Sequence, residues 1–196
     1  MRLLAIGCHA DDIDLGCAGT LAKLTKDDWE VHILIVTDGA GGGDSVQRVA
    51  EQRNALDFIQ PKSVRFLELP DRELVASKLV PHIEEATGHL LPDLTLVNSP
   101  VDTHQDHRAC AIATKAALRT NGNLLFYQAM TTQEFLPTVF VDITAFCELK
   151  LDMLRAHESQ CGRRHLDHLA ATWWTYHALQ AGCRAAEGFV PWRLTY

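Results

Sequence analysis

The chain has 196 residues, of which 47% are hydrophobic and 22% charged, and its formal net charge is −7. These values are typical of a globular protein that buries its own core without disulfide bonds. The acidic balance argues against a nucleic-acid partner, because phosphate binding needs a basic face, and the low aromatic content (7%) offers no stacking surface for single strands.

Short β-rich segments alternate with longer segments of helical periodicity along the chain. The expected strands are residues 3–7, 31–37, 64–67, 94–98 and 124–129, and the expected helices between them are residues 18–26, 46–59, 73–88 and 107–119. Beyond these the pattern is less regular, with a strand at 138–143 and helices at 145–157 and 166–183. No linker or internal repeat divides the chain, so we expect a single domain over residues 1–196.

Strands that alternate with helices are typical of βαβ units and a parallel sheet. The strands are nearly continuous apolar runs, as expected when helices cover both faces. We therefore predict an α/β fold, a Rossmann-like three-layer arrangement with a mostly parallel sheet of order 3-2-1-4-5 and a C-terminal extension.

The N-terminal apolar run, residues 1–8, is too short for a signal peptide, and carboxylates follow it at once. No segment approaches the ~18 apolar residues that span a bilayer. The six cysteines form no CxxC pair and several lie in apolar stretches, which indicates buried, reduced thiols. We therefore expect a cytoplasmic protein without a membrane partner.

Two clusters of metal-binding side chains follow predicted strands. Residues 9–12 (HADD) follow the first strand, and residues 104–107 (HQDH) follow the fourth and open a helix. Each cluster contains two potential ligands three residues apart, a spacing that places both on one side of a turn. Imidazole and carboxylate ligands suit zinc, and three of them with a water molecule make a catalytic site. In the order 3-2-1-4-5, strands one and four are neighbours whose ends bracket the switch point, so both clusters should share one crevice.

Two other segments invite a functional interpretation but favour a structural one. Residues 165–168 (HLDH) repeat the spacing of the second cluster without following a strand, so we expect a polar helix start or a loop there. The glycine-rich residues 38–44 follow the second strand, and the first strand-to-helix turn, residues 7–19, lacks GxGxxG. We therefore expect a flexible rim that admits a substrate, and no dinucleotide site.

Residues 9–16 (HADDIDLG) resemble the signature of the PIG-L/LmbE-type de-N-acetylases. The resemblance continues in order to the end of the chain and is therefore specific. The further matches are residues 18–20 (AGT), 37–39 (TDG), Arg48, Glu51 and Ala55 in an RxxExxxA helix, 69–71 (LPD), 104–107 in the place of HPDH, 141–143 (VDI), Lys150, 156–160 (AHESQ) and 186–189 (AEGF).

The chain departs from the family pattern at three positions. Ala10 and Gln105 replace prolines, and neither position carries a group that the chemistry needs. The glutamate that often follows the paired aspartates is Ile13 here, with Asp14 one place on. The HADD variant resembles the branch of the family that acts on bacillithiol precursors.

The resemblance implies hydrolysis of an acetyl group from an amide nitrogen, usually on an amino sugar. It implies that His9, Asp12 and His107 hold Zn²⁺, although Fe²⁺ or Co²⁺ would accept the same ligands. Asp11 would be the general base, and a protonated His104 would help to stabilise the oxyanion. Either of these two residues could protonate the leaving amine.

The resemblance also points to Arg48 and Asp71 as contacts for sugar hydroxyls or a phosphate. The alternative for Arg48 is an ion pair on the helix surface. Asp106 would orient an imidazole from behind the metal ligands or, equally well, cap the helix that it opens.

The expected partner is a small N-acetylated molecule. Trp173, Trp174 and Tyr176 would form a stacking wall for it, or belong to the core or to a homo-oligomer interface. Rival functions are a zinc amidase that cleaves a larger acyl group or a thiol conjugate, a non-catalytic sugar- or metal-binding module and, more remotely, a nucleotide-binding oxidoreductase.

Overall fold

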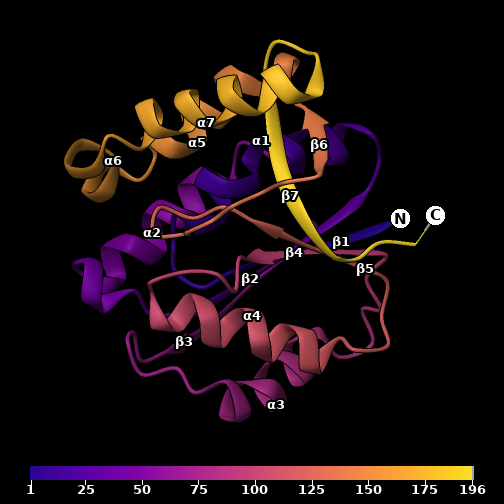
Figure 1. Ribbon diagram of the computed structural model, residues 1–196. Coiled ribbons are helices and arrows are strands. Elements are labelled where there is room, and N and C mark those ends of the chain that lie inside the picture. The colour runs from indigo at the N-terminus through magenta and orange to yellow at the C-terminus, as the bar shows by residue number, and fades with distance from the viewer. Residues whose placement is uncertain (196) are drawn as a thin grey trace.

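The computed structural model describes residues 1–195, which form a sheet of seven strands in the order β3-β2-β1-β4-β5-β7-β6 (Figure 1). Strands β1 to β5 run parallel, and β7 pairs antiparallel with both β5 and β6. The strands are β1 Arg2–Gly7, β2 Glu30–Thr37, β3 Ser63–Leu69, β4 Leu94–Asn98, β5 Asn123–Tyr127, β6 Val139–Asp142 and β7 Ala186–Arg193.

Helices cover both faces of the sheet and make a three-layer sandwich (Figure 1). Helices α3 and α4 lie on one face, and α1, α2, α5 and α7 lie on the other, with α6 at the end of that layer. The helices are α1 Asp12–Lys26, α2 Ser45–Leu56, α3 Ala76–Thr87, α4 Gln105–Ala117, α5 Cys147–Arg155, α6 Glu158–Arg164 and α7 Leu166–Ala181, with short 3₁₀ turns at Ala40–Gly42 and Thr144–Phe146.

The alternation of side chains along β1 explains why both faces are covered. Leu3 and Ala5 enter the core cluster beneath α1, whereas Leu4 and Ile6 enter the cluster beneath α3 and α4. All four are buried, so the strand contributes apolar surface to both layers. After Arg2, the next polar residues belong to the HADD cluster, which follows the carboxyl end of the strand.

The predicted α/β class and the order 3-2-1-4-5 are confirmed, and the C-terminal extension adds β7 and β6 to the same sheet. Two elements were not predicted from the sequence, α6 and β7. Helix α6 has only seven residues and little apolar periodicity, while Gly188 and Pro191 obscure the pattern of β7. Helix α1 begins at Asp12 and not at residue 18, because the turn that carries the HADD cluster leads directly into it.

A buried ion pair fastens the C-terminal part to the first helix. Lys150 Nζ on α5 lies 2.6 Å from Glu187 Oε1 on β7, and it also donates to the carbonyl oxygen of Leu15 at 2.7 Å. The Glu187 carboxylate accepts the backbone N–H groups of Gly19 and Thr20. These contacts connect α1, α5 and β7, so they help to fix the helix that begins at the site.

All six cysteines are free, and Cys8, Cys17 and Cys110 are buried, as expected for reduced thiols. Across residues 1–195, no helix is long and apolar enough to cross a membrane.

Candidate metal centre and active site

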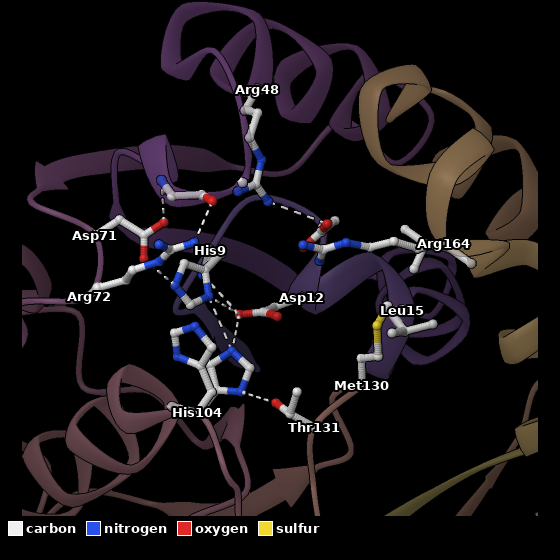
Figure 2. Close-up of a pocket in the computed structure, with 15 residues that line it drawn as sticks. His9, Asp12, Leu15, Arg48, Asp71, Arg72, His104, Met130, Thr131 and Arg164 are labelled. Atoms are coloured by element: carbon white, nitrogen blue, oxygen red, sulfur yellow. Dashed lines mark hydrogen bonds and ion pairs between the residues drawn. The ribbon is translucent and has the colours of Figure 1, made fainter.

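Strands β1 and β4 are neighbours, and the segments that follow their carboxyl ends meet in one cavity (Figure 2). His9, Asp11 and Asp12 come from the turn into α1, and His104 and His107 come from the start of α4. The structure therefore brings together the two clusters that the sequence placed at neighbouring strand ends.

Three donor atoms from these segments form a triangle. His9 Nδ1 and His107 Nε2 are 3.1 Å apart, and each lies 3.4 Å from Asp12 Oδ2 (Figure 2). Ligands held tetrahedrally around zinc at roughly 2.0–2.1 Å are about 3.3 Å from one another. The three atoms thus match one face of such a tetrahedron, and a fourth position is left for a water molecule or a substrate.

Two carboxylates hold the far sides of the imidazole rings. Asp71 Oδ1 lies 3.0 Å from His9 Nε2, and Asp102 Oδ2 lies 3.0 Å from His107 Nδ1. Each ring can donate its outer N–H to a carboxylate, an arrangement that would leave the lone pair of the other nitrogen to a metal ion in the triangle. Asp102 is itself fixed by the hydroxyl groups of Thr131 and Thr132, at 2.6 and 2.9 Å.

A second group of potential ligands shares His9 with the first. It consists of His9, Asp71, His104 and Asp106. The carboxylates in this group are already engaged, since Asp71 also accepts the Gly41 N–H at 2.9 Å. Cys8 lies near the first group, but burial raises the pKa of its thiol well above the usual value, so it stays protonated. The triangle is therefore the better metal site.

Asp106 supports the loop after β3. Its carboxylate accepts the backbone N–H groups of Arg72 at 2.5 Å and of Leu74 at 3.2 Å, and one oxygen lies 3.7 Å from His9 Nε2. The cap of α4 is His104, whose Nδ1 accepts the Asp106 N–H at 3.3 Å. Asp106 thus stands behind His9, as expected for a residue that orients an imidazole, but Asp71 makes the closer contact.

Neighbouring carboxylates oppose the effect of burial on the two histidines of the triangle. Burial lowers the pKa of His107, but the carboxylates of Asp12 and Asp102 outweigh it and raise that pKa to about 10. Burial likewise opposes protonation of His9, and neighbouring carboxylates raise its pKa well above the usual value. The 3.1 Å contact between the two rings requires one nitrogen to accept, so the pair shares a proton there. A divalent cation would replace that proton as the partner of Asp12.

Asp11 has an unusual backbone, and its Oδ2 is a buried acceptor atom without a hydrogen-bond donor. Its φ of 92° lies in the left-handed region, a conformation that costs on the order of 1–3 kcal/mol for a residue other than glycine. Gln52 Oε1 accepts its N–H at 3.1 Å, and Arg48 Nη2 lies 3.3 Å from its Oδ2. Burial raises the pKa of the carboxyl group, an effect that Arg48 partly offsets. Such a carboxylate, without a hydrogen-bond donor on Oδ2, is suited to accept a proton.

His104 stacks on His107, with ring centroids 4.7 Å apart. Burial and the neighbouring rings of His9 and His107 lower the pKa of His104. The lowered pKa favours the neutral ring, whereas the resemblance led us to expect a protonated one. Because Nδ1 accepts a backbone N–H, the ring proton is on Nε2, where it can be donated to a substrate.

Arg48 and Asp71 line the cavity, but both are also engaged with the protein. Arg48 is buried and donates to the carbonyl oxygens of Gly39 at 2.9 Å and Ala10 at 2.5 Å. It does not form the surface ion pair that was the alternative. Trp173 and Trp174 pack near Leu15 and Leu166, outside the cavity, and the side chain of Tyr176 is exposed.

Gly41 and Gly42, from the loop that we expected to form a rim, line the cavity. Further residues line it without having been predicted from the sequence: Leu15, Arg72, Met130, Thr131, Arg164 and Leu166. The HLDH segment lies beside this set, but His165 is exposed at the junction of α6 and α7 and His168 is also exposed. Leu166 and Arg164 reach the cavity instead. No motif marks Arg164 or Leu166, since their position depends on how α6 packs.

A doubly wound sheet with a His–Asp–His triangle and a buried carboxylate at its switch point defines a hydrolase site of the kind that metal-dependent enzymes use. Comparison with known proteins agrees. The family model for the GlcNAc-PI de-N-acetylases (PIG-L) matches residues 4–118. The chain belongs to this family, whose members are metal-dependent N-deacetylases, and it is an amide hydrolase.

Individual relatives cover most of the chain. The uncharacterized deacetylase YaiS of Escherichia coli is 31% identical over 167 residues, which cover 80% of this chain and 90% of YaiS. The diacetylchitobiose deacetylase of Thermococcus kodakarensis is 29% identical to this chain, and the match covers 97% of this chain and 83% of that deacetylase. The conserved protein TT1542 from Thermus thermophilus has a TM-score of 0.89 at 25% identity, with 99% of this chain and 96% of TT1542 covered.

Proposed function

We propose that the chain removes the acetyl group from N-acetylated amino sugars of the N-acetylglucosaminyl type, with Zn²⁺ held by His9, Asp12 and His107. The observation that carries this proposal is the triangle of donor atoms beside the buried carboxylate of Asp11. A divalent ion supplies Lewis-acid chemistry there, since it polarises a carbonyl group and lowers the pKa of water. Fe²⁺ and Co²⁺ accept the same ligands, so the metal itself is part of the proposal.

Asp11 is the general base in this proposal. Its carboxylate lies in the same cavity as the triangle, and burial raises its pKa toward the range that proton transfer at neutral pH needs. Arg48 keeps the carboxylate in place and prevents the pKa from rising further. Asp11 takes a proton from the attacking water molecule.

His104 donates its Nε2 proton as a hydrogen bond to the oxyanion that forms at the acetyl carbonyl. Its second nitrogen is occupied by the Asp106 N–H, so the neutral ring has only one proton to offer. Loss of that proton would leave an imidazolate. We therefore assign protonation of the leaving amine to Asp11, which gained a proton in the first step.

The substrate class rests on relatives. One relative is a diacetylchitobiose deacetylase, and the matching family is described as acting on GlcNAc-PI, which suggests a linear N-acetyl group on glucosamine for this chain too. Arg48 and Asp71 line the cavity, where sugar hydroxyls could reach them. We propose that both residues mainly position other residues of the site: Arg48 holds Asp11, and Asp71 holds His9. We also propose that residues 1–196 form a single domain.

An acetate-release assay tests the function. N-acetylglucosamine and diacetylchitobiose are offered to the protein with zinc, after removal of metal with a chelator, and after zinc is restored. We expect acetate and free amine only when metal is present. Release of longer acyl chains in preference to acetyl would favour the rival amidase. Absence of hydrolysis across all acyl sugars, with zinc bound, would favour a binding module.

A further inference from the structure

Positive side chains surround the cavity of an acidic protein. Three guanidinium groups line it, and they come from α2, from the loop after β3 and from the end of α6; these are Arg48, Arg72 and Arg164 (Figure 2). Three carboxylates line the same cavity, those of Asp11, Asp12 and Asp71. The charges of these six side chains cancel, and a divalent ion would add two positive charges to the lining, although the chain carries a net charge of −7. Such a cavity favours an anionic ligand.

The three arginines differ in how many of their N–H groups already bond to other parts of the protein. Arg48 is buried, and its guanidinium serves two backbone carbonyl oxygens and Asp11. It is part of the support for the base and has little left to offer a ligand.

Arg164 is unpaired. It is the last residue of α6 and is exposed. Within residues 1–195 its guanidinium has no hydrogen-bond partner and no carboxylate oxygen within 4.0 Å. Figure 2 shows its side chain reaching from α6 across the cavity toward the region between Arg48 and Asp12. A free guanidinium in a concave wall is different from one on an open surface, because a ligand can contact it while bound to other residues.

The helix that carries Arg164 is fixed by specific contacts. Glu51 on α2 accepts the backbone N–H of Ser159 at 2.9 Å and its hydroxyl at 2.6 Å. Gln160 Nε2 donates to the carbonyl oxygen of Gly42 at 3.2 Å. These bonds attach α6 to α2 and to the glycine-rich loop. The position of Arg164 over the cavity therefore follows from the packing of α6.

Arg72 faces the same cavity from the other side. Its backbone has a φ of 67° and is held by the N–H bond to Asp106. One guanidinium nitrogen donates to the carbonyl oxygen of Gly41 at 2.6 Å, and the group makes no ion pair among the described residues. A guanidinium has five N–H donors, so most of those on Arg72 are available to a ligand.

We infer that Arg164 and Arg72 form an anion subsite, so that the preferred substrate is an N-acylated amino sugar that carries a phosphate or a carboxylate group. The inference rests on the proposed function, which places the amide at the metal triangle. Guanidinium groups bind both anions through paired N–H donors. Charge on the substrate then supplies specificity without any contact to the reacting atoms.

The test compares matched substrates on the zinc-loaded protein and on Arg164→Gln. N-acetylglucosamine is the neutral reference, N-acetylglucosamine 1-phosphate and 6-phosphate test a phosphate, and N-acetylmuramic acid tests a carboxylate. We expect kcat/KM to favour at least one anionic substrate about tenfold, and Arg164→Gln to remove most of that preference while the neutral substrate changes less than about threefold. Higher salt should reduce the preference.

Arg163→Gln is the matched control, because Arg163 is adjacent, exposed and outside the cavity, with one long bond of 3.4 Å to Gly42. It removes the same charge and should leave the preference unchanged. An equal loss for neutral and anionic substrates in Arg164→Gln would overturn the inference, since Arg164 would then act on Asp11. Equal loss of preference in both variants would show a general charge effect and would also overturn it.

A second measurement separates this inference from the proposed function. Calorimetric titration with glucosamine and glucosamine 6-phosphate reports the subsite without any hydrolysis. Absence of acetate release from every substrate would contradict the deacetylase proposal, whereas tighter binding of the phosphorylated ligand would still support the subsite. If neither calorimetry nor kcat/KM distinguishes charged from neutral ligands, the subsite does not exist.

Discussion

Asp102 Oδ2 lies 3.0 Å from His107 Nδ1, and the hydroxyl groups of Thr131 and Thr132 fix that carboxylate from behind. The contact favours a proton on Nδ1, so that Nε2, which faces Asp12 and His9, is the nitrogen left to a metal ion. The carboxylate thus determines which nitrogen of His107 can bind a metal.

Replacement of this carboxylate should weaken metal binding. Asp102→Ala is expected to lower zinc affinity by about 10- to 100-fold, because the ring of His107 loses its orienting partner. Competition with a chromophoric chelator measures the affinity directly. Asp142→Asn is the control, since Asp142 is exposed and its carboxylate bonds only to Thr144 nearby. Unchanged affinity in Asp102→Ala would show that the contact does not support the ligand.

Metal affinity should rise with pH. The carboxylates of Asp12 and Asp102 raise the pKa of His107 to about 10, and the pKa of His9 is also raised. Protonation therefore stabilises the metal-free fold fully below about pH 6.5, the usual histidine pKa, and that contribution is lost as pH rises toward 10. A metal must displace these protons, so its affinity should increase up to about tenfold per pH unit for each proton released.

The affinity is measured between about pH 6 and pH 8 in buffers that do not bind zinc. The difference in melting temperature between the zinc-loaded and metal-free protein should widen over the same range. An affinity that stays constant with pH would contradict the assignment of both rings as ligands.

Gly16 is required by a close contact between α1 and the sheet. A Cβ atom at this position would overlap the ring of Tyr127 and approach the Gln128 carbonyl oxygen. The ring cannot move aside, because it is fully buried and its hydroxyl donates to Ile6 O at 2.8 Å. Gly16→Ala should reduce the free energy of unfolding by about 1–3 kcal/mol.

Gly162→Ala is the matched comparison for chemical denaturation. This glycine lies within α6 and a Cβ there would meet no atom within 4 Å. Alanine is the better helix former, so the variant should gain up to about 1 kcal/mol. If both variants were equally stable, the close packing of α1 on Tyr127 would be refuted.

The extent to which the sequence predicts this structure depends on the range of the interactions involved. Apolar strand runs and helical periodicity predict the five parallel strands, because both patterns are local. The proximity of the two motifs follows from topology, because ligand sites lie where strands one and four end. Both predictions require only element type and order.

The remaining features depend on contacts between distant segments. Asp102 lies five residues before His107 with no spacing rule to mark it, and Thr131 and Thr132 reach it from the segment after β5. The left-handed backbone of Asp11 depends on Gln52, which is 41 residues away. Arg164 lines the cavity because α6 is attached to distant segments, to α2 through Glu51 and Ser159 and to the glycine-rich loop through Gln160.

The most direct test of the account is Asp11→Asn, with zinc content and acetate release measured on the same preparation. The change removes the proton acceptor and leaves His9, Asp12 and His107 in place. Asp28→Asn is the control, because Asp28 is exposed and has a similar left-handed φ of 61°. The account predicts that Asp11→Asn keeps stoichiometric zinc by elemental analysis while kcat/KM falls about 10²- to 10⁴-fold. Loss of zinc from the variant would make Asp11 a ligand, and near-normal turnover would remove it as the base; either result contradicts the account.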